Sequence, residues 1–144
     1  MIVDANILLY AVDTRSPFHQ PAKSWLENAL SGSARVGLPW VSLGAFLRIA
    51  THPRVSANPL LPVDAWSRVE DWLSAEPTWI PEPTSRHQEL LRSLIIDGDL
   101  RGNLIPDAHL AALALEHGVG VCSADSDFAR FPQLKWVNPT RPTG

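Results

Sequence analysis

The feature that most constrains the fold of this chain is a regular alternation of short apolar segments with helical ones. The chain opens with the apolar segment Ile2-Val3, and the stretch from Phe18 to Leu30 repeats its apolar residues every three or four positions, as an amphipathic helix does. Parallel strands need a crossover between them, and a helix usually supplies it. The alternation therefore predicts an α/β fold, a three-layer α/β/α sandwich around a mostly parallel sheet. The expected strands are 2–4, 35–38, 78–80, 119–122 and 135–137, and the expected helices are 6–13, 18–30, 40–51, 63–73, 86–96 and 107–117.

Length and composition limit how the chain is organised. Its 144 residues, 45% hydrophobic and 19% charged, fit one ordinary globular domain. We expect that domain over residues 1–138 and a flexible tail over 139–144, because no repeat or linker interrupts the pattern. No segment is long and apolar enough to span a bilayer, and the single cysteine, Cys122, cannot form an internal disulfide. We therefore expect a cytoplasmic protein without a membrane segment.

The charge balance excludes one class of function and leaves another open. A net charge of −3 argues against a plain DNA-binding module, which normally carries a basic patch. It does not argue against a nuclease, because acids that hold a metal ion enter the same sum. Arginine greatly outnumbers lysine among the cations, and the planar guanidinium suits phosphate recognition.

Three aspartates stand where they contribute little to a fold. Asp4 and Asp125 follow expected strands, and Asp107 begins the most apolar helix. Taken singly, each is explained as a helix cap or a turn former, and a cap stabilises a helix by about 1 kcal/mol. In parallel α/β folds, however, ligands bind beyond the carboxyl ends of the strands. Carboxylates that converge there without cysteine or histidine favour Mg²⁺ or Mn²⁺ over zinc.

The motifs around these aspartates resemble those of a known family. Asp4-Ala5-Asn6, the block from Pro106 to Ala114, and the block from Cys122 to Phe131 are similar to the PIN-domain family, and more narrowly to VapC-type toxins of toxin–antitoxin systems. The resemblance covers almost the whole chain, in the family's order. It implies a three-layer α/β/α fold and an endoribonuclease that depends on Mg²⁺ or Mn²⁺. It also implies two protein partners, a small VapB-like antitoxin and a second copy of the chain in a homodimer.

The resemblance also implies a role for each residue that matches a motif. Asp4 corresponds to the family's first acid, Asp107 to the third, and Asp125 or Asp127 to the fourth. We favour Asp125 because it lies nearer the strand end, so the expected metal ligands are Asp4, Asp107 and Asp125. Asn6 matches the small polar residue after the first acid, which is expected to hold a water or a neighbouring ligand, or else to cap the helix.

One position departs from the family's pattern. The family has a glutamate on the helix after the second strand, and the corresponding residue here is Phe46. A phenyl ring cannot coordinate a metal ion. Asp97 or Asp99 would have to replace the missing acid from a loop. The departure favours one metal ion over two. It also supports an alternative function, that of a catalytically weak or inactive PIN-like scaffold that binds other proteins.

The same helix offers a candidate contact surface for RNA. Arg48, Thr51 and His52 are spaced to share one helix face, where they would contact the RNA backbone near the cut. Each is equally explained as an exposed residue near a helix end.

Two other classes of protein also gather acids at strand ends, but this chain lacks an acid that each of them needs. A receiver-type regulator needs an aspartate after its third strand, where this chain has Ile80-Pro81. A haloacid-type phosphatase needs a second acid at the position of Asn6.

Overall fold

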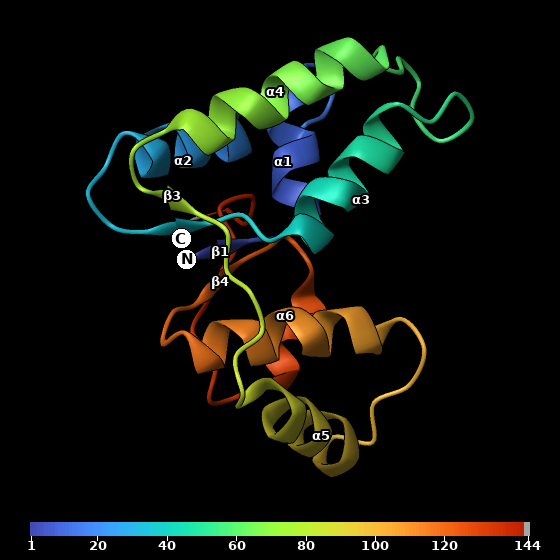
Figure 1. The fold of residues 1–144 in the computed structure, drawn as a ribbon. Coiled ribbons are helices and arrows are strands. Elements are labelled where there is room, and N and C mark those ends of the chain that lie inside the picture. Colours follow the sequence, from blue (N-terminus) through green and yellow to red (C-terminus); the bar gives the residue numbers. More distant parts are fainter. Residues whose placement is uncertain (143–144) are drawn as a thin grey trace.

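A fully parallel sheet lies between two layers of helices in the computed structural model, which describes residues 1–142 (Figure 1). The strand order is β3-β2-β1-β4-β5, and all four neighbouring pairs are parallel. The predicted fold class is confirmed. The strands are β1 (Ile2–Val3), β2 (Val36–Gly37), β3 (Thr78–Trp79), β4 (Val121–Cys122) and β5 (Trp136–Val137).

The helices form the two outer layers. Figure 1 shows these layers on either side of the strands. The first layer contains α1 (Ala5–Val12), α2 (His19–Leu30), α3 (Trp40–Ala50) and α4 (Pro62–Ser74). The second contains α5 (His87–Asp97), α6 (Leu104–Glu116) and the short 3₁₀ helix η1 (Ser126–Arg130).

Each layer packs its own hydrophobic core against one face of the sheet. Successive strand residues point to opposite faces, so Val3 joins the core with α1 to α4 and Ile2 joins the core with α5 and α6. Both side chains are fully buried. Strands covered on both faces read as continuous apolar runs, which explains why the central strands lack polar alternation.

Helix α6 begins three residues earlier than predicted. It starts at Leu104 because Pro106 is tolerated in a first turn, where backbone N–H groups have no partner inside the helix. Asp107 consequently lies inside the first turn, and Asn103 is the N-cap. The capping explanation for Asp107 is therefore wrong.

The end of the chain folds back on the last strand. The Asn138 side chain accepts hydrogen bonds from the backbone N–H and the hydroxyl of Thr140, and the Arg141 guanidinium lies 4.8 Å from the centre of the Trp136 ring. The flexible tail stays a prediction, and residues 143–144 lie outside the described residues. Among residues 1–142, no helix has the length and apolar character required to cross a membrane.

Candidate active site

Parallel pairing brings the ends of β1 and β4 together. Val3 pairs with Cys122, and the backbone N–H of Asp4 donates to the carbonyl of Cys122 at 2.9 Å. The next residues, Asp4 and Ser123, therefore leave the sheet side by side, although 119 positions separate them in the sequence.

Ser123 connects the groups around Asp4. Its hydroxyl donates to Asp4 Oδ2 at 2.6 Å and accepts from Asn6 Nδ2 at 3.2 Å and from the backbone N–H of Asp125 at 3.0 Å. The residue is fully buried. Sequence reasoning missed Ser123, and the available signal was a small polar residue directly after an apolar strand.

Asp4 and Asn6 hold the start of α1 against the loop after β4. Asp4 is the N-cap of α1, with Oδ1 accepting from the N–H of Ala5 at 2.8 Å, so the capping explanation holds for one oxygen. The other oxygen faces Ser123. Asn6 Oδ1 accepts from the N–H of Ala124 at 3.1 Å, and its Nδ2 lies 3.4 Å from Asp4 Oδ2.

Three other carboxylates converge from α6 and η1. Oxygens of Asp107, Asp125 and Asp127 lie within 4.8 Å of one another. Asp125 is the N-cap of η1, and its Oδ1 accepts from the N–H of Asp127 at 2.9 Å. Asp127 also lies 3.5 Å from the exposed Arg130 Nε. Asp4 does not belong to this group of three, but it is close enough for its charge to act on Asp107.

The electrostatics of the site disfavour several negative charges at once. Burial, first, and the charges of Asp125, Asp4 and Asp127 together raise the pKa of Asp107 from an ordinary 3.8 to about 7. Burial also raises the pKa of Asp4, against the hydrogen bonds from Ser123 and Ala5, which lower it. No cation is among the groups that set these two values.

This arrangement fits a hard divalent cation. The donor atoms are carboxylate oxygens, which Mg²⁺ and Mn²⁺ prefer, and a bound cation would relieve the repulsion that raises the pKa of Asp107. Asp125 and Asp127 both approach Asp107, so both sequence candidates for the fourth acid lie at the site.

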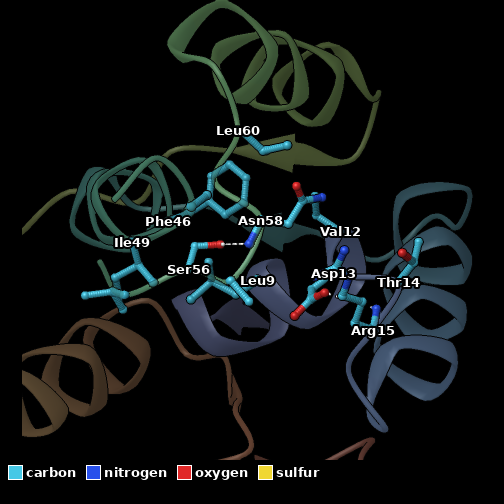
Figure 2. A pocket seen from close by; sticks show the side chains of 13 residues that line it. Leu9, Val12, Asp13, Thr14, Arg15, Phe46, Ile49, Ser56, Asn58 and Leu60 are labelled. Carbon is cyan, nitrogen blue, oxygen red and sulfur yellow. Dashed lines mark hydrogen bonds between the residues drawn. The ribbon is translucent and has the colours of Figure 1, made fainter. Parts of the chain in front are cut away.

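Phe46 does not face this cluster. It is fully buried, packs edge-on against Trp72 of α4 at 4.9 Å between ring centres, and forms one wall of a cavity of about 360 Å³ with Leu9 and Leu60 (Figure 2). A carboxylate at this position would point into the apolar core between α1, α3 and α4. Phe46 therefore lies in the core and not beside the acidic cluster, and its correspondence to the family's glutamate stays a prediction.

The two loop acids do not replace the missing glutamate. Asp99 is exposed and accepts from the Arg101 guanidinium at 3.0 Å, and Asp97 is exposed at the end of α5. Neither belongs to an acidic group that could hold a metal ion among the described residues.

Two of the three predicted RNA contacts have local structural roles. The Thr51 hydroxyl donates to the carbonyl of Leu47 at 2.7 Å, and His52 Nδ1 accepts from the backbone N–H of Arg54 at 3.1 Å. Both bonds stabilise the end of α3. Arg48 is exposed on the same helix. RNA binding by these residues stays a prediction.

Comparisons with known proteins agree with this architecture. The family model described as PIN domain matches residues 1–134. "Ribonuclease VapC37" of Mycobacterium tuberculosis is 47% identical over 138 residues, 96% of each chain, and "Ribonuclease VapC33" of the same species is 40% identical over 141 residues, 98% of this chain and 99% of the relative.

Two solved structures share the fold at low sequence identity. VapBC2 from Rickettsia felis, bound to a DNA fragment from its promoter, superposes with a TM-score of 0.66 at 18% identity and covers 95% of this chain and 96% of that one. FitAB bound to a DNA fragment gives a TM-score of 0.68 at 16% identity and covers 99% of this chain and 97% of that one. With a family model and close relatives that span nearly its whole length, the chain belongs to the PIN-domain family, in its VapC-type branch.

Proposed function

We propose that this protein is the endoribonuclease toxin of a toxin–antitoxin pair and hydrolyses RNA phosphodiester bonds with Mg²⁺, for which Mn²⁺ can substitute. The observation that carries the proposal is the convergence of Asp107, Asp125 and Asp127 within 4.8 Å, beside Asp4, with no cation to balance Asp107. The relatives named as ribonucleases support RNA as the substrate.

Each side chain has a role in this proposal. Asp4, Asp107 and Asp125 hold the ion, and Ser123 and Asn6 keep the Asp4 carboxylate oriented through their hydrogen bonds. A bound divalent ion supplies a more acidic water and offsets the charge that develops on the phosphoryl oxygens. Asp127 lies beside the ligands and orients the attacking water.

The partners follow from the same family. The fold neighbours are chains of VapBC and FitAB assemblies, which supports a small VapB-like antitoxin as the partner of this chain. We also propose a homodimer. Coexpression with a small adjacent gene, followed by copurification and a mass measurement in solution, tests both partners.

Cleavage of RNA by the purified chain tests the enzymatic proposal. We expect cleavage with Mg²⁺ or Mn²⁺, none in EDTA, and a loss of about 100-fold or more in Asp107→Asn, because a metal ligand contributes several kcal/mol to the transition state. Asp97→Asn is the matched control, since Asp97 is an exposed acid outside the cluster. Undiminished cleavage by Asp107→Asn would refute the assigned roles.

Calorimetry separates the enzyme from the alternative function. An enzyme of this kind binds Mn²⁺, and the binding weakens in Asp107→Asn. A chain that neither binds Mn²⁺ nor cleaves RNA would be the non-catalytic PIN-like scaffold.

A further inference from the structure

Two tryptophans form an exposed stack on the first helical layer. The rings of Trp40 on α3 and Trp66 on α4 lie 6.4 Å apart and within 9° of parallel, and the residues are 48% and 42% exposed. Trp66 Nε1 donates to Glu70 Oε1 at 2.7 Å, which fixes the ring that backs Trp40. Single exposed apolar residues are normal, whereas two exposed rings stacked on each other present a continuous aromatic surface that a partner can cover.

The stack lies at the edge of the sheet that carries the acids. Strand β2 is parallel to β1, and Ile2 pairs with Gly37. Continuing this register by two residues places Pro39 opposite Asp4, so Trp40 begins α3 directly beyond the carboxyl end of β2. Neighbouring strands are about 4.8 Å apart. Trp40 therefore begins α3 next to the strand end that carries Asp4.

Two further residues extend this surface along α3. Trp40, Gly44 and Arg48 succeed one another at intervals of one helical turn, and all three are exposed. A Cβ added to Gly44 would meet nothing within 4 Å, so packing within the described chain does not require glycine there. Glycine is less favourable than alanine inside a helix. Gly44 leaves this face of α3 open to close approach by a molecule from outside.

The charge of this region is opposite to that of the whole protein. No acidic residue occurs between Glu27 and Asp64, although the chain contains 15 acids. The cations in this stretch are Arg35, Arg48 and Arg54. In the part of the chain that the structure describes, neither Arg48 nor Arg54 forms an ion pair. Arg35 lies over Trp79 before β2 and Glu70 is bonded to Trp66, so the positive charge that this face offers to a phosphate is that of Arg48.

We propose that this face of α3 binds single-stranded RNA next to the phosphate that is cut. An unpaired base stacks on Trp40, the sugar-phosphate backbone passes over Gly44, and Arg48 holds a neighbouring phosphate. Aromatic stacking accepts any base, so this surface supplies affinity and position more than sequence specificity. The inference rests on the proposed ribonuclease function and adds the residues that place the strand.

Binding is measured by fluorescence polarisation of a labelled single-stranded RNA of mixed sequence, in EDTA, with Asp107→Asn as the parent so that no cleavage occurs. We expect Trp40→Ala to weaken binding about 5- to 100-fold, the range for loss of one base–aromatic stack, and Trp40→Phe to retain most of the affinity. Gly44→Gln should weaken binding by blocking the approach. The matched control is Ile96→Ala, which removes an exposed apolar residue from α5 in the opposite layer.

Two results would overturn this inference. The first is an RNA affinity that is the same in Trp40→Ala, in Gly44→Gln and in the parent. The other is a dimeric parent that becomes monomeric in Trp40→Ala with unchanged RNA affinity, which would make the surface an interface between copies of the chain. If the otherwise unmodified protein cleaves RNA in either case, the proposed function survives and only this inference fails. If it neither binds nor cleaves RNA, both fail.

Discussion

Helix α6 carries one carboxylate in its first turn and another in its last, and the two lie in opposite chemical surroundings. Asp107 is surrounded by other carboxylates, and its pKa rises to about 7. Glu116 has a fully buried side chain, yet its oxygens accept from the N–H of Thr84 and meet His87 Nδ1. Burial would raise the pKa of Glu116, but these hydrogen bonds outweigh it and lower the pKa.

Burial acts to raise the pKa of both carboxylates, and only Glu116 has hydrogen-bond donors that outweigh it, so the difference between the two lies in their partners. A helix N-terminus favours a negative charge by about 0.3–1 kcal/mol, less than one pKa unit, and a C-terminus disfavours it. Both carboxylates have shifted against this preference. Glu116 is held as a structural acid that joins α6 to α5, whereas Asp107 remains in need of a cation.

The largest effect is expected from removing Glu116, the carboxylate that has hydrogen-bond partners. We expect Glu116→Ala to lower the free energy of unfolding by about 3 kcal/mol, because hydrogen bonds to a charged group contribute about 1.5–3 kcal/mol each and the partly buried donors of Thr84 and His87 would lose their acceptor. Urea unfolding measures the loss. Glu89→Ala, an exposed acid on α5, is the control, and equal stability of the two variants would contradict the structural role.

A smaller effect is expected from removing the Ser123 hydroxyl. This hydroxyl bonds to the Asp4 carboxylate, as His87 and Thr84 bond to that of Glu116. Ser123→Ala removes the hydroxyl that donates to Asp4 Oδ2, so the pKa of Asp4 should rise further and RNA cleavage should fall about 10-fold. The pH at which cleavage is half-maximal should also increase. Ser126→Ala alters an exposed serine at the start of η1 and should change neither quantity. Indistinguishable pH profiles for the two variants would show that Ser123 does not influence cleavage through Asp4.

A further expected effect is a pH dependence of stability in the metal-free protein. The folded-state pKa of Asp107 lies above its ordinary value, so the folded chain binds more protons than the unfolded chain between about pH 4 and 7. Stability should therefore fall as the pH rises through this range. Glu116, with its lowered pKa, contributes stability that is lost only as the pH falls.

Thermal unfolding in EDTA at pH 5 and pH 8 measures this slope. Asp107→Asn should flatten it, and Mg²⁺ should raise the Tm of the unmodified protein more at pH 8 than at pH 5. The same slope in the unmodified protein and in Asp107→Asn would show that the carboxylates do not repel one another as described.

Local patterns in the sequence predicted most elements of the fold. Apolar spacing placed α4 within one residue at each end, and α2 within one residue at its start. The boundary of α6 was missed because Pro106 reads as a helix breaker, although it is tolerated within a first turn. The buried surroundings of Phe46 were not predicted, because motif spacing does not state which face of a helix meets the core.

The sequence by itself determined a parallel α/β sandwich and the edge at which its acids gather, because strand ends and crossovers follow from short-range periodicity. Only the tertiary structure decided which of those acids lack a compensating partner. Ser123 reaches Asp4 across 119 positions and His87 reaches Glu116 across 29, and no local pattern encodes either contact. The charge state of a carboxylate depends on every group within a few ångströms, and those groups are known only once the chain has folded.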